Sequence, residues 1–153
     1  MTRMLELWRV IVPTVWLGMI IALSFIEPIL KFQAPGINTP LGLGIGRLTF
    51  VAMAISGWTL LVLTTLVSVR RMTRADVINL ALLWVILAVQ TFVVRPPLTA
   101  RSDIIIAGGD PGESNLHYVY IATDVVLLTL LVIWIWRSAR ALSRRIDVVP
   151  PRA

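Results

Sequence analysis

The sequence predicts an all-α integral membrane protein, a bundle of four helices, and three observations lead to this fold class. The chain of 153 residues is 58% hydrophobic and only 14% charged, and a water-soluble domain of this size could not cover so much apolar surface. Four apolar segments each have near the ~20 residues that a helix needs to cross ~30 Å of hydrocarbon. Most arginines lie at alternate ends of these segments, as expected of a membrane protein with a fixed orientation. We therefore expect residues 1–153 to form a single transmembrane domain.

The apolar segments predict helices at approximately 10–30, 48–69, 77–94 and 116–136. The first could be a signal peptide, but it continues to Leu30 and no small-residue cleavage site follows, so we expect a retained helix. Segments rich in proline, glycine or charge separate the helices, at 34–40, 70–76 and 96–112. Pro28 falls near the outer end of the first helix, where polar neighbours or water could satisfy the freed backbone group.

The packing of the helices is predicted from their connections and their small residues. Short connections make consecutive helices antiparallel neighbours in a compact bundle. Gly18 with Ala22, and Ala52 with Ser56, are small residues four positions apart. Such pairs let helix backbones approach closely in a membrane, so we expect them to face other helices.

Positive side chains predict the orientation of the bundle. One side of the membrane collects Arg3, Arg9, Arg70, Arg71, Arg74, Arg137, Arg140, Arg144, Arg145 and Arg152, and the other only Lys31, Arg47, Arg95 and Arg101. The positive-inside rule therefore predicts that both termini and the middle loop are cytoplasmic, with residues 137–153 as a basic cytoplasmic tail. We expect a multi-pass protein of the plasma membrane, in a bacterium the inner membrane. The net charge of +6 follows this topology and forms no single patch, so we expect no nucleic-acid partner.

Two segments lie outside the predicted spans. Residues 41–46 read Gly-x-Gly-x-Gly, but a phosphate-binding glycine loop needs a preceding strand, and the sequence offers none. We expect a tight turn at the outer surface there. The short apolar run 102–107 is expected to lie on the outer interface as a helical turn.

Polar and ionisable side chains gather towards the outer ends of the helices, while the inner halves carry no charge. They are Glu27, Arg47, Gln90, Arg95, His117, Tyr120 and Asp124. Because ionisable groups are costly in a bilayer, a one-sided cluster indicates function, and we predict that these residues line a ligand-binding pocket. His117, Tyr120 and Asp124 share one helix face at i, i+3 and i+7. Asp124 lies ~12 Å from the outer end, so it should face the bundle with a partner, or be protonated.

Structural interpretations compete with this functional one. Arg47, Arg95 and Lys31 are typical of residues that reach up to lipid headgroups. His117 could be an interfacial hydrogen-bonding residue, and Gln90 an amide that links two helices. Glu27 could pair with Arg47 or Arg95. For Glu27 and Asp124, a role in binding or proton handling is favoured over a purely structural ion pair.

Several chemistries are disfavoured. The chain has no cysteine, which excludes disulfides and thiolate sites, and its single histidine excludes haem held by two histidines. Copper held by His117 with Met19 or Met53 is conceivable, although methionines of this kind more often serve packing. Ser24 and Ser114 have no convincing histidine partner for hydrolysis. The inner halves lack a carboxylate, which disfavours a proton or ion pathway. We predict no catalytic residue and no metal site, and the sequence leaves any cofactor unknown.

A dispersed set of residues carries a resemblance to known proteins. These are Trp16-Leu17-Gly18, Glu27-Pro28 with Lys31-Phe32, Gly44-Ile45-Gly46-Arg47, and Ser114-x-x-His117-x-x-Tyr120. Over most of residues 10–136 the chain resembles small bacterial four-helix membrane proteins of unknown function. These in turn look distantly like bundles of the transmembrane-protein-205 and copper-resistance-protein-D type. The resemblance implies a four-helix integral membrane fold and no established activity, and a copper role would need more histidine or methionine ligands.

Three functions remain open from the sequence. The first is a membrane binding module whose outer pocket takes a lipid headgroup, a quinone-like molecule or a cation, with membrane lipid as its partner. The second is an accessory or structural subunit of a larger membrane complex, or a homo-oligomer. The third is an enzyme acting on lipid or quinone. A non-enzymatic role is favoured over an enzymatic one because no activated nucleophile is evident.

Overall fold

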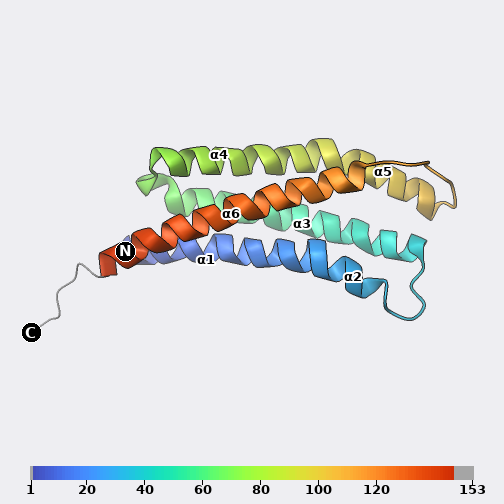
Figure 1. Ribbon diagram of the computed structural model, residues 1–153, viewed down its shortest axis with the longest axis horizontal. Coiled ribbons are helices and arrows are strands. Elements are labelled where there is room, and N and C mark those ends of the chain that lie inside the picture. The colour runs from blue at the N-terminus through green and yellow to red at the C-terminus, as the bar shows by residue number, and fades with distance from the viewer. Residues whose placement is uncertain (1, 147–153) are drawn as a thin grey trace, which may run out of the picture.

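The computed structural model describes residues 2–146, which are all-helical, with no strand among them. Four helical rods lie side by side and alternate in direction (Figure 1). The helical stretches Met4–Lys31, Thr39–Arg71, Arg74–Ile106 and Leu116–Arg144 are each long and apolar enough to cross a membrane. The predicted all-α fold with four membrane-length helices is therefore confirmed.

Each rod except the last is built from more than one helical segment. The first joins α1 (Thr2–Ile20), the π-helix η1 (Ile21–Ile26) and α2 (Glu27–Lys31), and the second joins α3 (Thr39–Ser68) to the 3₁₀ turn η2 (Val69–Arg71). The third joins α4 (Arg74–Val89), the π-helix η3 (Gln90–Val94) and α5 (Arg95–Ile106), and the fourth is α6 (Leu116–Ile146). The helix of the fourth rod thus continues well into the segment expected to be a tail.

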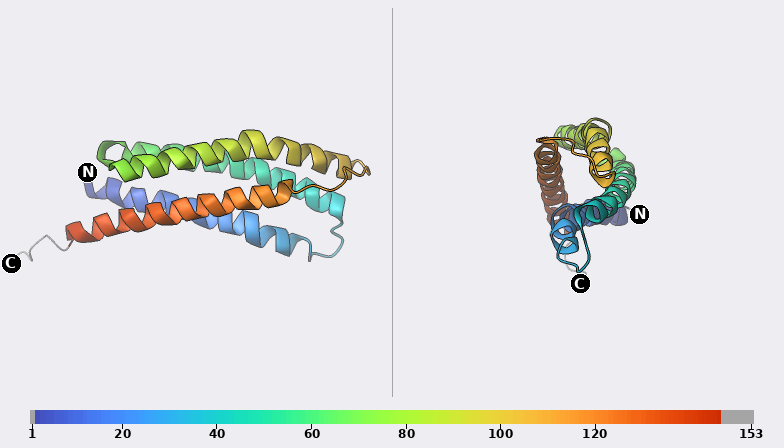
Figure 2. Two further views of the ribbon diagram at one scale, coloured as in Figure 1. Left: turned by 45° about the horizontal axis from the view of Figure 1, so that its top comes forward. Right: turned by 90° about the vertical axis from the view of Figure 1, so that its right-hand side faces the viewer.

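The rods enclose a common core, as an end-on view shows (Figure 2). The first rod packs against the second and fourth, and the third rod also packs against the second and fourth. The start of α1 and the end of α6 lie at the same end as the α3–α4 connection, which we call the termini end (Figure 1). The connections 32–38 and 107–115 lie at the opposite end, which we call the loop end.

Each π-helix ends two residues before a proline, Pro28 in the first rod and Pro96 in the third. The π-helices explain why the rods continue through these prolines. Proline lacks an N–H and clashes with the carbonyl four residues earlier, which ordinarily breaks a helix. The widened turns place the Glu27 N–H on the Ala22 carbonyl and the Arg95 N–H on the Gln90 carbonyl, five residues back in each case. Pro28 is thus accommodated within the helix by the widened backbone turn. The third helix, expected to end at 94, continues past Pro96-Pro97 to Ile106, and this corrects the placement of 102–107 as a separate interfacial turn.

The glycine-rich segment 41–46 is helical, which corrects the expected turn. It belongs to α3, where the Asn38 side chain accepts a hydrogen bond from the Leu41 N–H at 2.9 Å and Pro40 stands in the first turn. Glycine is common in membrane helices, where its weak helix propensity is overridden by packing. At Gly42 a Cβ atom would lie 2.3 Å from Phe32 Cε1, so the glycine makes room for this ring.

The apolar core occupies the middle of the bundle. It contains Trp16, Ile20, Leu61, Leu80, Leu83, Leu87, Leu127, Leu131 and Trp134. Gly57 lets the second rod approach it, because a Cβ atom there would lie 3.4 Å from Leu87 Cδ1. The small-residue pairs do not have the expected role, since Gly18, Ala22 and Ala52 are exposed on the outside of the bundle. A Cβ atom added at Gly18 would meet nothing within 4 Å.

Candidate functional site

Two clusters of polar side chains lie on either side of this core. The loop-end cluster comprises Ser24, Glu27, Lys31, Gln90, Arg95, Tyr120 and Asp124. The termini-end cluster comprises Glu6, Arg9, Arg71, Thr73, Asp76 and Arg137. The two clusters contain the same kinds of residues but differ in how completely their buried carboxylates are bonded.

Asp124 is the most deeply buried acid of the loop-end cluster, with 1% of its surface exposed. Gln90, buried in η3, donates from Nε2 to Asp124 Oδ1 at 2.6 Å and to Thr123 Oγ1 at 3.1 Å. Gln90 therefore links the third rod to the fourth, as expected of an amide between helices. Burial of an acid is costly unless it is hydrogen-bonded, so this amide is needed to keep Asp124 in the bundle.

Arg95 joins three rods from the inside. Its side chain is buried and donates from Nη1 to the Phe50 carbonyl at 2.9 Å. Its Nη2 atom donates to Tyr120 Oη at 3.3 Å and to Gln90 Oε1 at 3.5 Å. The guanidinium also lies 5.9 Å from the ring centre of Phe50 and 5.7 Å from that of Tyr120. The interpretation of Arg95 as a headgroup-reaching residue is wrong, because the rod continues past Pro96 and leaves Arg95 inside it.

A methionine connects Tyr120 to the first rod. The Tyr120 hydroxyl donates to Met53 Sδ at 3.9 Å, and the Ser24 hydroxyl donates to the same sulfur at 3.6 Å. Met53 is therefore occupied by weak hydrogen bonds within the protein and serves packing between rods. The described residues contain no group of three or more His, Cys, Asp or Glu side chains placed to hold a metal ion.

A cavity of about 310 Å³ opens beside this cluster at the loop end, and all four rods contribute to its wall. Its polar lining includes Ser24, Glu27, Lys31, Arg47, Thr49, Ser102, His117 and Asp124, together with the aromatic side chains of Phe32, Phe50 and Tyr120. The volume falls at the lower end of the range of ligand pockets, ~300–1,000 Å³. The site can therefore hold the head of a small amphiphile or a comparable polar group.

Glu27 lines this cavity and is only half satisfied. Its Oε2 atom accepts from Lys31 Nζ at 3.2 Å, one helical turn along the same rod. Its Oε1 atom is buried and has no hydrogen-bond partner within residues 2–146. The expected pair of Glu27 with Arg47 or Arg95 does not form, because Arg47 pairs with Asp103 across to α5.

Asp124 shows the same half-satisfied state. Its Oδ1 atom accepts from Gln90, while Oδ2 is buried and receives no donor from the described part of the chain. The Ser24 hydroxyl lies beside both this carboxylate and Met53 Sδ, and its single proton serves one of them at a time. An unpaired buried polar group costs ~1–3 kcal/mol, so two such oxygens on one cavity require an explanation.

The predicted site residues divide into two groups. The cavity lining includes Glu27, Arg47, His117, Tyr120 and Asp124. Gln90 and Arg95 do not line it but lie behind Asp124 and Tyr120 and hold them in place. His117 is exposed and lies at the start of α6, nearer the loop end than Asp124.

Two partners at this site were absent from the prediction. Lys31 could have been found from its i, i+4 spacing to Glu27, a standard helical ion pair. Asp103, the partner of Arg47, had no usable signal, because the helix that carries it was expected to have ended before it.

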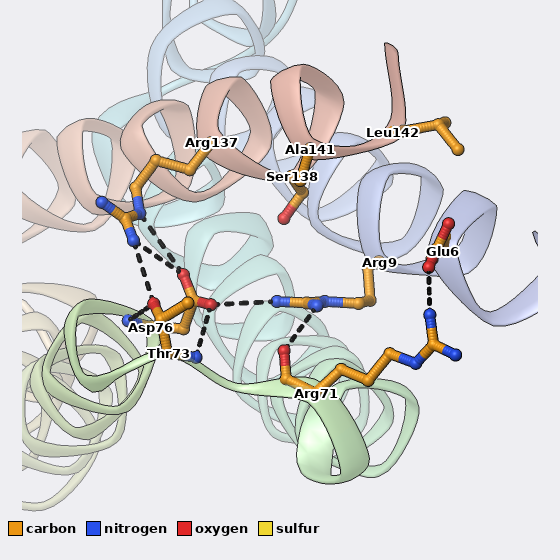
Figure 3. Close-up of a pocket in the computed structure, with 9 residues that line it drawn as sticks. All are labelled: Glu6, Arg9, Arg71, Thr73, Asp76, Arg137, Ser138, Ala141 and Leu142. Carbon is orange, nitrogen blue, oxygen red and sulfur yellow. Dashed lines mark hydrogen bonds and ion pairs between the residues drawn. The ribbon is translucent and has the colours of Figure 1, made fainter. Parts of the chain in front are cut away.

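The termini-end cluster is centred on Asp76, which sequence reasoning missed. Asp76 is buried and occupies the third position of α4 in a capping box with Thr73, with reciprocal bonds of 3.2 and 3.0 Å. Arg9 donates to Oδ2 at 3.3 Å, and Arg137 donates to Oδ1 from Nη2 at 3.2 Å and from Nε at 3.3 Å (Figure 3). Both oxygens of Asp76 are thus bonded.

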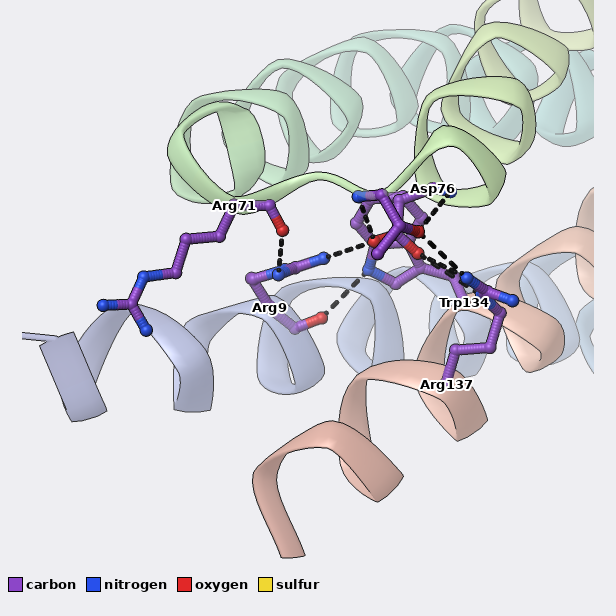
Figure 4. A network of polar contacts seen from close by, with 6 residues as sticks. Arg9, Arg71, Asp76, Trp134 and Arg137 are labelled. Atoms are coloured by element: carbon purple, nitrogen blue, oxygen red, sulfur yellow. Dashed lines mark hydrogen bonds and ion pairs between the residues drawn. The ribbon is translucent and has the colours of Figure 1, made fainter. Parts of the chain in front are cut away.

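Further contacts extend this cluster across the termini end. Arg9 also donates to the Arg71 carbonyl at 2.9 Å, and its own carbonyl accepts from Trp134 Nε1 at 3.1 Å (Figure 4). Glu6 pairs with the Arg71 side chain. The cluster lines a smaller cavity of about 190 Å³ and ties α1, η2, α4 and α6 together (Figure 3).

The expectation that the inner halves lack a carboxylate is therefore corrected, since Asp76 is a buried acid of the termini end. It had been assigned to the loop 70–76, although the Thr73-x-x-Asp76 pattern is a helix-start signal that could have placed it in a helix.

Comparison of the chain with protein-family models, with curated proteins and with solved structures gives no match. The resemblance drawn from dispersed residues therefore stays a prediction, and function must be argued from the geometry of the site.

Proposed function

We propose that this protein is a membrane binding module whose loop-end cavity holds the polar head of a membrane-resident molecule. A lipid headgroup, a quinone-like molecule or a cation would each fit this description. The observation that carries the proposal is the pair of carboxylates, Glu27 and Asp124, each with one oxygen lacking a donor, on one cavity of about 310 Å³. A bound ligand would supply the missing hydrogen bonds.

The surrounding contacts support binding by a preorganised site. Gln90 holds Asp124, and Arg95 holds Tyr120, through hydrogen bonds made before any ligand enters. Side chains fixed in this way lose little freedom on binding, which favours affinity. The role of Gln90 and Arg95 in this proposal is therefore to position the groups that contact the ligand.

The region between the two clusters supports binding rather than passage. The stretches 10–26, 51–69, 77–89 and 125–136 contain no ionisable residue. A proton or ion pathway needs polar stations across the whole membrane, and the apolar core interrupts such a path. This supports a site that opens towards one leaflet only.

The distribution of arginines supports an orientation for this site. Under the positive-inside rule the termini end, with its excess of arginine, is cytoplasmic, in a multi-pass protein of the plasma membrane. The loop end and its cavity would then lie in the outer leaflet. A fusion of a cytoplasm-active reporter to each terminus tests this orientation, which fails if either fusion is expressed but inactive.

Native mass spectrometry of the gently extracted full chain tests the binding function. We expect one tightly retained small molecule per chain, lost in Glu27→Gln and His117→Ala. Glu113→Gln, a matched change at an exposed position on the 107–115 connection, should retain it. Circular dichroism of each variant verifies that the bundle is intact. The proposal fails if the two cavity variants retain the same species as the parent.

One observation favours a second candidate function, that of a subunit in a larger assembly. Gly18, Ala22 and Ala52 are exposed, although small residues of this kind let membrane helices pack closely. They leave open a face to which a second copy or another membrane protein could dock. The same mass measurement decides, because a chain that is always monomeric and without protein partners contradicts this candidate.

A further inference from the structure

The unpaired polar atoms of the loop-end cavity indicate which hydrogen-bonding groups its ligand has. This inference rests on the proposed function, the binding of a ligand in that cavity. Glu27 Oε1 and Asp124 Oδ2 are both acceptors, and neither has a donor among the residues that the structure describes. Lys31 already donates to the other oxygen of Glu27, and Gln90 to the other oxygen of Asp124. In their ionised form both carboxylates only accept, so the ligand that suits them donates hydrogen bonds.

Three acceptors, from Ser24, Glu27 and Asp124, line the same cavity. The Ser24 hydroxyl lies beside Met53, Tyr120 and Asp124, and its oxygen has two lone pairs, so it can accept a hydrogen bond while it donates its one proton. Glu27 follows Ser24 by three residues in the same rod, and side chains at this spacing have Cβ atoms ~5–6 Å apart. A primary ammonium group has three N–H donors, which equals the number of these acceptors. Its positive charge also suits the two carboxylates.

The basic side chains of the cavity lie nearer its loop end. His117 precedes Asp124 by seven residues, or ~10 Å along α6, and Lys31 follows Glu27 by one turn towards the loop end. Arg47 lies about one turn nearer the loop end than Phe50, and both line the cavity. The cavity thus has carboxylates in its depth and basic side chains near the loop end, where Lys31 is paired with Glu27 and Arg47 with Asp103. An anionic group there would compete with these two acids for the same donors.

We propose that the ligand is a lipid whose zwitterionic headgroup ends in a primary ammonium, with a phosphate behind it. The ammonium binds among Ser24, Glu27 and Asp124, and the phosphate lies near Lys31, Arg47 and His117. A trimethylated ammonium of equal charge has no N–H donor and leaves both carboxylate oxygens unpaired. The site therefore selects for hydrogen-bond donors and not for charge alone.

Competition between lipids with matched acyl chains tests this assignment. The full chain is equilibrated in mixed micelles with equal amounts of phosphatidylethanolamine, phosphatidylcholine and phosphatidylglycerol, and retained lipid is counted by native mass spectrometry. We expect one phosphatidylethanolamine per chain, preferred over phosphatidylcholine by about tenfold or more, since at least one charge-assisted hydrogen bond is lost with choline. Glu27→Gln and Asp124→Asn should abolish the preference, and Glu113→Gln should keep it.

The outcomes separate this inference from the proposed function. If phosphatidylcholine or phosphatidylglycerol is retained as well as phosphatidylethanolamine, and Glu27→Gln releases it, the cavity binds lipid but the ammonium assignment is overturned. If no lipid is retained above the level of the Glu27→Gln variant, the lipid-binding function itself is overturned. A long-chain primary alkylamine added as competitor tests the phosphate. If it displaces phosphatidylethanolamine at equal concentration, the phosphate contributes nothing and the assignment of a phospholipid is overturned.

Discussion

The two ends of this bundle carry buried aspartates in similar company, yet the aspartates are bonded very differently. At the termini end, Asp76 receives donors on both oxygens, from Arg9, Arg137 and the backbone of Thr73. At the loop end, residues 2–146 supply a donor to Asp124 on Oδ1 only and to Glu27 on Oε2 only. A buried acid is therefore not in itself a sign of function. Complete bonding indicates a structural role, and an oxygen left without a donor beside a cavity indicates a ligand.

The strongest test of this distinction replaces the fully bonded acid. Asp76→Asn removes the charge that pairs with Arg9 and Arg137, and it replaces one of the two acceptor oxygens with an amide donor that faces an arginine. Breaking a buried ion pair from one side costs ~3–5 kcal/mol, so we expect a loss of about 3 kcal/mol in the free energy of unfolding. Chemical unfolding in detergent, followed by tryptophan fluorescence, measures it. Asp110→Asn, in the exposed 107–115 connection, serves as the control. A loss below about 1 kcal/mol would contradict a structural role for Asp76.

The next test removes the one donor that Asp124 has. Gln90→Leu leaves both oxygens of Asp124 unpaired in the bundle, and we expect a loss of about 2 kcal/mol, within the ~1–3 kcal/mol of a buried unsatisfied group. The double variant Gln90→Leu with Asp124→Leu should recover part of this loss, because no unpaired acid remains. Unfolding of the single and double variants forms a mutant cycle, and additive losses would show that the two side chains are not coupled.

Asp124→Asn is the same substitution at the loop end, and we expect it to change the free energy of unfolding much less than Asp76→Asn does. In Asp124→Asn the new Oδ1 still accepts from Gln90, and a costly buried charge with one free oxygen is gone. We expect the free energy of unfolding of the ligand-free protein to change by less than about 1 kcal/mol, while retained ligand is lost. The same unfolding assay, run after delipidation, measures the change. If Asp124→Asn destabilises as much as Asp76→Asn, the distinction between the two ends is wrong.

The sequence predicts the number of rods, their order and the side of the bundle on which Glu27, His117 and Asp124 gather. These follow from hydropathy and helical spacing, which are local properties of the chain. The ends of the rods could not be predicted, because proline and glycine were expected to break helices. In the structure a π-turn accommodates Pro96, and helix α3 contains Gly42.

The partners of the charged residues were harder to predict than their positions. The pairing of Arg47 with Asp103 depends on α5 continuing past Pro97, and the burial of Arg95 depends on the same continuation. An error of twelve residues in one helix end, 94 against Ile106, therefore changed two expected contacts. The burial of Asp76 was missed for a similar reason, since its capping box was interpreted as part of a loop.

The smallest expected effect concerns the exposed pair of Arg47 and Asp103, whose side chains are 45% and 49% exposed. An ion pair in such a position contributes ~0–1 kcal/mol and is screened by salt. We therefore expect Asp103→Asn to lower the free energy of unfolding by about 0.5 kcal/mol in low salt and to have no measurable effect in about 1 M salt. Asp76→Asn should keep most of its effect at both salt concentrations, because a buried pair is screened much less. A salt-independent loss in Asp103→Asn would show that this contact is buried by something bound over it. The pair would then belong to the functional end of the molecule and not to its surface.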